Sequence, residues 1–521
     1  MPDSGTDLKV EVVPWGPAPH AVRAAAEQLL QHPVVREELG DAERRVLAVA
    51  PDSDDSGLVR ATIYDYTNER AVLVDAAVDG GQPVAVRSSS RQPPPNSDEF
   101  QAALDSLSKD PDLGPGIREG RLEPYRPMPP LVLDEQPDGT VRRTVAVGLK
   151  SPKEPAAHEI VAVHPARGEV TRFDGGAPPG SRATGTLCGL PNANQATANQ
   201  GDAGQAKVTV SQGGQVLWTL IAVRPAASSG TNGSGIELLR VAYRGKRVLR
   251  RAHVPILNVR YDGDACGPFR DWQWEESKID AQGTDPAPGF RVCSAPAKTI
   301  LDSGSDHGNF LGVAVYVDGD EVVLVSEMEA GWYRYVSQWR LDADGTIRPR
   351  FGFGAVEDSC VCNLHHHHVY WRLNFDVATG AHNDVGEFND PPLSPGASKW
   401  HSLPHEVRRL NRPSHKRRWR VKNRVTDEAY TLVPGPSDGK ADGFGIGDMW
   451  ALRARPHQFD DGQGFTTDPA EARAHINRFI NGESIVDTDV VLWYAAHFAH
   501  DVHAAGDGSH VVGPELVPSG W

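Results

Sequence analysis

At 521 residues, the chain is longer than a single hydrophobic core normally organises, so we expect two to four domains. Hydrophobic residues make up 39% of the sequence and charged residues 23%, which excludes an intrinsically disordered protein. The formal net charge of -16 argues against a nucleic-acid partner, because phosphate binding needs clustered lysine and arginine side chains.

The N-terminal part of the chain is predicted to form two small α+β domains. In the first, residues 18–91, the segment from Ala18 to Leu30 has apolar residues at helical spacing, and alternating strand patterns follow it. In the second, residues 92–173, Ser97 can cap a helix that precedes further alternating strands. Both patterns are typical of a helix packed on an antiparallel sheet.

Strand patterns dominate the rest of the chain. Residues 174–206 are rich in Gly, Ala, Asn, Pro and Gln without periodicity, which indicates a linker or long loop, and residues 1–17 are expected to form a tail. Residues 207–521 contain many short strands separated by Gly-rich turns, a pattern typical of a large β-sandwich. We therefore expect a mainly β fold in which this sandwich follows two small α+β domains.

The cysteines and the N-terminus indicate in which cellular compartment the protein is expected. The five cysteines are few and unevenly spaced, unlike the dense framework of small secreted domains, and they favour a reducing compartment. The N-terminus lacks a basic start followed by an apolar stretch, and no apolar segment approaches the length of a membrane span. We therefore expect a cytoplasmic protein without a membrane partner.

The strongest chemical signal is a run of four histidines, from His365 to His368, that opens a predicted strand. Because side chains alternate along a strand, His365 and His367 point to one face. Two imidazoles on one face can chelate a copper or zinc ion, and a third histidine from elsewhere completes a typical site. A polar loop with incidental metal affinity is the alternative interpretation of the run.

This region resembles the copper amine oxidases. In that family a His-x-His pair opens a strand that continues into Arg-Leu-Asp-x-Asp, and here His365 and His367 are followed at the same distance by Arg372-Leu-Asn-Phe-Asp376. The third family ligand follows a strand that matches Thr488-Asp-Val-Val-Leu-Trp-Tyr494, and His500 falls at its position. The resemblance extends to the small domains and the β-rich region, and it implies that His365, His367 and His500 hold copper.

The family makes its quinone cofactor, topaquinone, from a tyrosine inside an Asn-Tyr-Asp/Glu motif, with the help of its own copper and dioxygen. Aligning back from Asp344-Gly-Thr-Ile347 puts Tyr333 at the precursor position. Trp332 replaces the Asn and Arg334 replaces the acidic residue, and a bulky Trp changes the room in which the ring can turn. Tyr333 is thus either a quinone precursor or an ordinary strand tyrosine beside copper.

The family's catalytic base is an Asp that follows a Trp-Gln pair and removes a proton from the substrate. By ungapped count Ser277 stands at that place, and a serine is not a base unaided. Glu275, Glu276 or Asp271 could take over the role, or they could be exposed carboxylates without one. Tyr261 matches the family tyrosine that contacts the quinone.

The resemblance also implies a second metal site, separate from the copper site. The family's second, structural metal site maps to Asn374, Asp376 and Asp489, where calcium would bind although Asn374 removes one carboxylate.

Cys360 and Cys362 precede the histidine run. They are either small buried residues of a strand or thiolates that would soften the metal site toward copper(I) or zinc.

The resemblance implies a copper-dependent oxidoreductase that converts a primary amine, dioxygen and water to an aldehyde, ammonia and hydrogen peroxide. Two alternatives stay open. One is a quinone-free copper enzyme that activates dioxygen on a specialised small molecule, and the other is a non-catalytic copper-binding relative. Because family members are usually homodimers, we also expect a homodimer.

Overall fold

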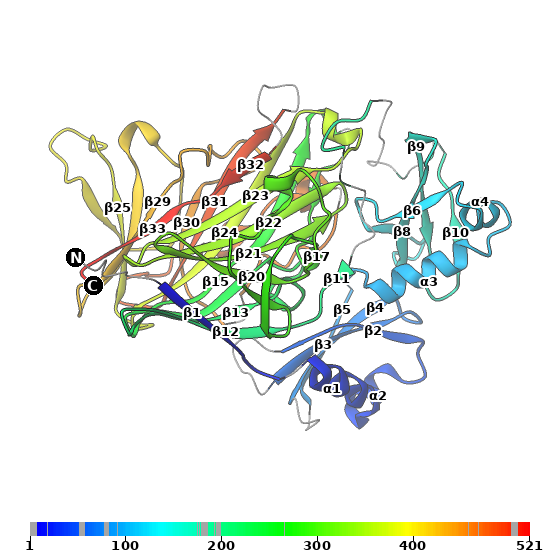
Figure 1. The fold of residues 1–521 in the computed structure, drawn as a ribbon, viewed down its shortest axis with the longest axis horizontal. Helices are drawn as coiled ribbons and strands as arrows, with labels where there is room; N and C mark the ends of the chain where they lie inside the picture. Colours follow the sequence, from blue (N-terminus) through cyan, green and yellow to red (C-terminus); the bar gives the residue numbers. More distant parts are fainter. Residues whose placement is uncertain are drawn as a thin grey trace.

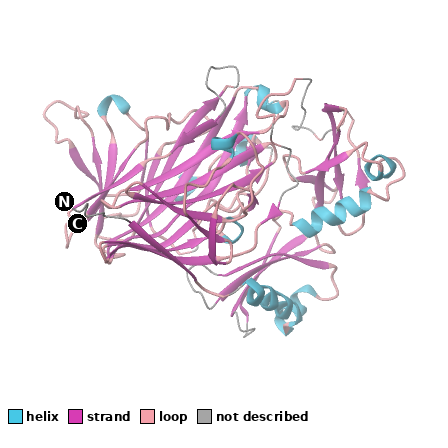
Figure 2. Ribbon diagram, viewed as in Figure 1, coloured by secondary structure: helices cyan, strands magenta, loops and turns pink. Residues whose placement is uncertain are grey.

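The protein is built mainly of β-strands, and in the computed structural model they form two small sheets and two large ones (Figures 1 and 2). The structure describes residues 8–521 except 18, 52–57, 78–82, 91, 175, 177, 179–185, 192, 194–198, 265, 457, 467 and 502–508. The expected fold class, a large C-terminal β-sandwich preceded by two small α+β units, is confirmed.

The first small unit is a four-stranded antiparallel sheet with two helices on its outer side (Figures 1 and 2). Its elements are α1 (Pro19–Gln31), α2 (Pro33–Leu39), β2 (Arg44–Pro51), β3 (Leu58–Asp65), β4 (Arg70–Ala77) and β5 (Pro83–Ser89). Ala25 and Leu29 of α1 are buried in one cluster with Val59 and Val72 of the sheet. The apolar stripe of this helix is therefore its packing face.

The second small unit has a similar plan. Its elements are α3 (Ser97–Leu107), α4 (Gly114–Arg118), β6 (Glu123–Tyr125), β7 (Leu131–Glu135), β8 (Val141–Ser151), β9 (Glu154–Val163) and β10 (Val170–Thr171). The predicted cap of α3 is wrong by one residue, because Asn96 and not Ser97 is the N-cap. The Asn96 side chain accepts a hydrogen bond from the N–H of Glu99, whose carboxylate accepts one from the N–H of Asn96. The domain boundary between 91 and 92 remains a proposal.

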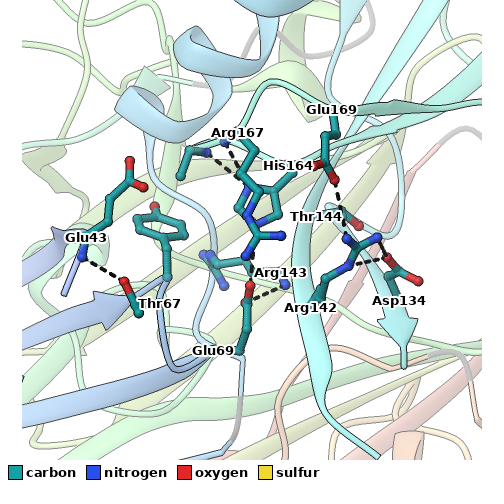
Figure 3. A network of polar contacts seen from close by, with 12 residues as sticks. Glu43, Thr67, Glu69, Asp134, Arg142, Arg143, Thr144, His164, Arg167 and Glu169 are labelled. Carbon is teal, nitrogen blue, oxygen red and sulfur yellow. Dashed lines mark hydrogen bonds and ion pairs between the residues drawn. The ribbon is translucent and has the colours of Figure 1, made fainter. Parts of the chain in front are cut away.

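A buried polar network joins the two small units (Figure 3). Arg143 of β8 donates to both carboxylate oxygens of Glu99, at 2.6 and 2.7 Å, and both side chains are fully buried. From the first unit, the Tyr66 hydroxyl donates to Glu99 at 2.6 Å. Glu69 accepts from the N–H of Arg143 at 2.9 Å and lies 3.3 Å from Nε2 of His164. Because these charges are paired and hydrogen-bonded, their burial is tolerated.

Replacing Arg143 with Met is expected to lower the free energy of unfolding by about 3–5 kcal/mol, since Glu99 would be left as an unpaired buried charge. Urea unfolding followed by circular dichroism measures this. Arg142→Met is the matched control, because Arg142 pairs with Asp134 at the surface and its loss should cost about 1 kcal/mol or less. Equal losses of unfolding free energy in the two variants would show that the buried Arg143–Glu99 pair is not the stabilising feature.

The large C-terminal unit consists of two sheets whose side chains share one apolar core. Over the described residues, the first sheet has ten strands: β1 (Leu8–Pro14), β12 (Gln205–Gln212), β13 (Gln215–Val223), β14 (Glu237–Tyr243), β15 (Lys246–Tyr261), β24 (His365–Ala378), β31 (Val490–His500), β30 (Met449–Arg453) and β27 (Val407–Arg409), with β16 (Phe269–Arg270) beside β15. The second sheet, counted over the same residues, has fourteen: β18 (Gly283–Ala287), β19 (Phe290–Cys293), β20 (Val313–Asp318), β21 (Glu321–Ala330), β22 (Tyr333–Asp342), β23 (Ile347–Ala355), β33 (Glu515–Ser519), β29 (Ala429–Val433), β28 (Arg418–Asn423), β25 (Asn383–Phe388) and β26 (Trp400–Leu403), with β11 (Asn199–Gln200), β17 (Glu275–Ser277) and β32 (Ser509–Val512) off this path.

The helices of the large unit are short. They are α5 (Ile300–Ser303), α6 (Pro469–Ala472) and the 3-10 turns η1 (Pro225–Ala227), η2 (Asp262–Asp264), η3 (Cys360–Cys362), η4 (Pro413–His415) and η5 (Ile476–Phe479). Among all described residues, no helix combines the length and the apolar composition that crossing a membrane requires.

Two segments differ from the expected tail and linker. Residues 8–14, expected in the tail, form β1, which pairs antiparallel with β12 because Leu8 and Val12 alternate with polar residues and are buried. Much of 174–206, the expected linker, lies outside the described residues. Within it, β11 pairs with β17, and β12 begins at Gln205. Both segments thus contribute strands to the large sheets.

Candidate metal centre

Three histidines meet between the two large sheets. His365 and His367 lie on β24, and His500 lies on the neighbouring β31, directly opposite His365 in the strand register. One ring nitrogen from each residue lies within 4.8 Å of the other two, and all three side chains are buried. The structure therefore brings together the three histidines that the sequence proposed as ligands, which we call the triad.

His365 and His367 are held in a protonation state that suits metal binding. Nδ1 of His365 lies 2.6 Å from the backbone oxygen of Asn363, so Nδ1 carries the proton and Nε2 presents a lone pair to the site. Burial, followed by the neighbouring His500, lowers the pKa of His365 to about 3. Burial, followed by His365, holds the pKa of His367 well below its ordinary value. Neutral imidazoles at pH 7 are the form that binds metal ions.

The surroundings of His367 indicate whether a metal ion fits this site. Its ring is fully buried, and among the described residues neither Nδ1 nor Nε2 has a hydrogen-bond partner. A buried polar group without a partner is destabilising, and a metal ion bound to one nitrogen would relieve part of that cost. Three imidazole ligands suit copper and zinc. The residues present therefore fit a copper ion.

Tyr333 reaches the triad from the opposite sheet. It is the first residue of β22, and its hydroxyl makes a hydrogen bond with Nε2 of His365 and lies 2.5 Å from Nδ1 of His500. Its ring centroid is 4.6 Å from that of His367. The predicted quinone precursor thus contacts the predicted metal ligands.

Trp332 and Tyr261 form an aromatic layer beside the triad. The indole N–H of Trp332 donates to the Tyr261 hydroxyl at 2.9 Å. The Tyr261 ring stacks on His365, with centroids 4.5 Å apart and planes at 23°. Trp332, which stands where the family has Asn, therefore fixes Tyr261 against a triad histidine.

Asp271 is the candidate base that the fold connects to Tyr333, through Tyr335. It accepts a hydrogen bond from the hydroxyl of Tyr335, whose ring is stacked on that of Tyr333 with centroids 5.4 Å apart and planes at 3°. Within the described part of the chain, Oδ1 of Asp271 is buried and has no hydrogen-bond partner. Burial raises the pKa of Asp271 to about 7 although the Tyr335 bond opposes the change. Such a carboxyl group can exchange a proton near neutral pH.

The other candidate bases have different partners. Arg224 holds Glu276 in a two-point ion pair at 3.0 and 2.5 Å, and Glu275 pairs with an arginine of the second small unit. Ser277 of β17 stands opposite Glu327 of β21 in the strand register. The expectation of exposed carboxylates is wrong, because all these groups are buried. Their arginine partners indicate structural roles for both glutamates.

Sequence reasoning missed Tyr335 and weighed Asp271 only as one of several substitutes. The signal for Tyr335 was present, because residues two apart on a strand share a face and Tyr333 was already a candidate. Asp271 gave no comparable signal, because its place beside Tyr335 depends on the pairing of distant strands.

Two disulfides flank the triad, Cys188–Cys362 and Cys266–Cys360. Cys360 and Cys362 lie in the turn η3 and not on a strand, and both are in disulfides, so neither presents a thiolate. The expected burial is confirmed for Cys360. Disulfides persist mainly in oxidising compartments, so the two bonds also count against the expected reducing compartment. The sequence did not reveal the pairing because both partners lie far away in the chain.

Replacing Cys266 and Cys360 together with Ala is expected to lower the free energy of unfolding by about 2–5 kcal/mol, because the bond closes a long loop. Loss of the bond should also weaken copper retention, since η3 directly precedes the strand that carries His365. Urea unfolding and copper content after dialysis measure the two effects. The control is Cys293→Ala, which alters the cysteine that is free among the described residues and should cost about 1 kcal/mol with copper retained.

The carboxylates proposed for a second metal site are partly paired with N–H donors. The Asn374 amide donates to Asp489 at 2.7 Å, and the Arg247 guanidinium pairs with Asp376 at 2.9 Å. Burial, followed by the neighbouring Asp376, raises the pKa of Asp489 to about 6. Calcium needs several oxygen ligands. One oxygen of each carboxylate is paired with an N–H donor, but Oδ1 of Asp376 is buried without a hydrogen-bond partner among the described residues, so calcium at this place stays a proposal.

A cavity of about 610 Å³ lies elsewhere, at the junction of the first small unit and the sandwich. Arg60 and Arg87 line one side, and Trp274 and Phe459 line the other. Its described lining contains no triad residue, so we do not assign it to the metal centre.

Comparison with solved structures finds the same fold in copper-containing and amine-oxidising enzymes. A copper-containing benzylamine oxidase from Hansenula polymorpha aligns with TM-score 0.59 and 13% identity, over 95% of this chain and 96% of that chain. An amine oxidase from Aspergillus nidulans aligns with TM-score 0.53 and 11% identity, over 98% and 88%. A lysyl oxidase from Pichia pastoris aligns with TM-score 0.50 and 10% identity, over 96% and 89%.

No protein-family model matches the chain, and no curated protein matches its sequence. At identities this low, the structural likeness shows a shared fold, and the reaction must be argued from the site.

Proposed function

We propose that this protein is a copper-dependent oxidase that oxidises primary amines with dioxygen. The observation that carries the proposal is the contact between Tyr333 and the buried triad of His365, His367 and His500. The likeness of the fold to a copper-containing oxidase favours copper over zinc as the bound ion. A small amine as substrate, dioxygen as co-substrate and a homodimer are parts of the same proposal.

Copper in this site would supply the one-electron chemistry that lets dioxygen react and that converts Tyr333 to topaquinone. The chain positions the precursor for this chemistry, because the Tyr333 hydroxyl lies against the nitrogens of His365 and His500. Tyr335, stacked on the Tyr333 ring, restricts how far that ring can tilt. The buried position between two sheets keeps bulk water away from the reacting atoms.

Asp271 would serve as the general base that removes the proton from the carbon next to the amine nitrogen. Its buried Oδ1 can accept a proton, and its pKa of about 7 suits this role near neutral pH. The overall reaction consumes amine, dioxygen and water and releases aldehyde, ammonia and hydrogen peroxide. Two electrons leave the amine carbon and reduce dioxygen to peroxide, so atoms and electrons balance.

A second candidate function is a copper enzyme in which Tyr333 stays a tyrosine and dioxygen reacts at the metal with another small molecule. The Trp332 bond to Tyr261 favours it, because this bulky pair occupies the side of the site where the family has a small Asn. Arg334, which replaces the acidic residue, is buried and ion-paired with Asp306. A non-catalytic copper-binding relative would keep the same contacts.

Reconstitution with copper separates these candidates. Protein expressed without copper is given copper(II) and air, and phenylhydrazine is added as a quinone trap. Under the proposal a visible band grows, and the hydrazone maps to the Tyr333 peptide, while Tyr333→Phe binds copper but develops no band. If copper binds and the Tyr333 peptide keeps its unmodified mass, the amine oxidase proposal is wrong. Dioxygen uptake with other reductants then distinguishes the quinone-free enzyme from a non-catalytic protein.

A further inference from the structure

Apart from the triad, a pair of buried histidines lies on the other face of the same two strands. His368 follows His367 on β24, so its side chain points away from the triad. It stands opposite His497 of β31 in the strand register, and both side chains are buried. The Nδ1 atoms of these two rings are 2.7 Å apart.

The outer nitrogens of the pair face acceptors. Nε2 of His497 lies 3.0 Å from the backbone oxygen of Gly447 and 3.3 Å from a carboxylate oxygen of Asp448. Nε2 of His368 lies 3.6 Å from Asp442, which is beyond hydrogen-bond distance but within reach of an ion pair. The two acceptors of His497 favour the tautomer that carries its proton on Nε2. Nε2 of His368 has no hydrogen-bond partner among the described residues, but the negative charge of Asp442 favours the same tautomer there. In these tautomers the two Nδ1 lone pairs point at each other. Lone pairs at such a distance repel unless a cation lies between them.

This arrangement matches how proteins prepare histidines for metal ions. A metal-binding imidazole usually donates its outer N–H to a carboxylate or a backbone carbonyl, which fixes the tautomer and the ring orientation. The triad residue His365 shows the same pattern, with its outer nitrogen on the backbone oxygen of Asn363. His497 has both a carbonyl and a carboxylate in this position.

The loop of residues 442–448 is shaped around the pair. A Cβ atom on Gly445 would lie 2.7 Å from Nδ1 of His497 and 2.9 Å from Nδ1 of His368, so the missing side chain leaves room beside both lone pairs. The next residue, Ile446, has φ of 58°, a strained conformation for a β-branched residue. Such strain persists where the surroundings enforce it, often at ligand sites. The Asp442 side chain is 38% exposed and gives the loop an edge at the solvent.

We propose that His368 and His497 bind a second first-row transition-metal ion of the zinc and copper class through their Nδ1 atoms, with water completing the coordination. Imidazole ligands select this class of ion over calcium or magnesium. A tetrahedral ion with bonds of about 2.0 Å needs nitrogens roughly 3.3 Å apart, so the rings must separate slightly on binding. The site shares no ligand with the triad and does not depend on the proposed amine oxidation.

Zinc titration of the full-length protein tests the proposal. Calorimetry of metal-free protein with Zn²⁺ should give two ions per chain for the wild type. His497→Gln should reduce the count to one, and His367→Ala with His500→Ala should leave the single ion that His497 binds. Asp448→Asn should still bind the second ion, but with an affinity roughly 10–100-fold lower, because the carboxylate orients the His497 ring.

The controls distinguish this site from adventitious binding. His382→Gln alters an exposed histidine that pairs with Asp487, and it should change neither count nor affinity. Circular dichroism and the remaining triad ion show whether His497→Gln is folded. If the wild type binds one ion and His497→Gln still binds one, the pair only shares a proton and the proposal is overturned. Two ions in both proteins would place the second ion elsewhere and would overturn it as well.

Discussion

Replacing Asp271 with Asn is expected to lower kcat for amine oxidation by about 100- to 10,000-fold, the usual contribution of a positioned general base. The amide keeps the shape of the side chain and can still bond to Tyr335, but it cannot accept the substrate proton. Copper content and the trapped quinone should be unchanged, so the loss is in the reaction with amine. Steady-state peroxide assays with a primary amine measure it.

Ser277→Ala is the matched control for this prediction. Ser277 stands at the family position of the base by sequence count, but in the fold it lies on β17 opposite Glu327, and a serine is not a base unaided. Its replacement should change kcat by only a few fold. If Ser277→Ala were as damaging as Asp271→Asn, the assignment of the base to Asp271 would lose its support.

The pH dependence of the wild type should report the same carboxyl group. Burial raises the pKa of Asp271 to about 7, and the base acts only when it is deprotonated. The value of kcat/KM should therefore fall about tenfold for each pH unit below that pKa. This limb should be absent from the residual activity of Asp271→Asn. An acid limb with a midpoint near the ordinary aspartate pKa would contradict the buried-base assignment.

Removing a triad histidine should have the other large effect. His367→Ala is expected to lower the copper affinity of the triad by more than roughly 100-fold, because even the loss of a group that only orients a ligand lowers metal affinity by roughly 10–100-fold. The variant should then show no conversion of Tyr333 and no amine oxidation. Copper should be counted after dialysis in a His497→Gln background, so that the second proposed site does not contribute.

His366→Gln provides the matched control for the triad. His366 lies between two triad residues, and its side chain points to the other face of the strand and is partly exposed. Its copper content should equal that of the parent protein. Equal copper loss in both variants would indicate a general disturbance of β24, and unchanged copper in His367→Ala would remove His367 from the ligand set.

The sequence by itself determined the class of the fold and most of the triad. Alternation of apolar and polar residues is a local property, and it identified the strands and the shared face of His365 and His367. The family motifs then pointed to His500 and Tyr333, because short motifs keep their spacing even when overall identity is low. The same local information predicted α1 and α3, with an error of one residue at the cap of α3, but it missed the shorter helices α2 and α4.

Only the tertiary structure decided which distant residues meet. The register between β24 and β31 places His497 opposite His368, and the packing of the two sheets places Tyr333 on the triad. The pairing of Cys360 and Cys362 with cysteines 94 and 174 residues away could not be read from spacing. The same holds for Asp271, whose raised pKa comes from burial. Spacing along the chain specifies which side chains share a face, but burial, register and long-range contacts depend on how the whole chain packs.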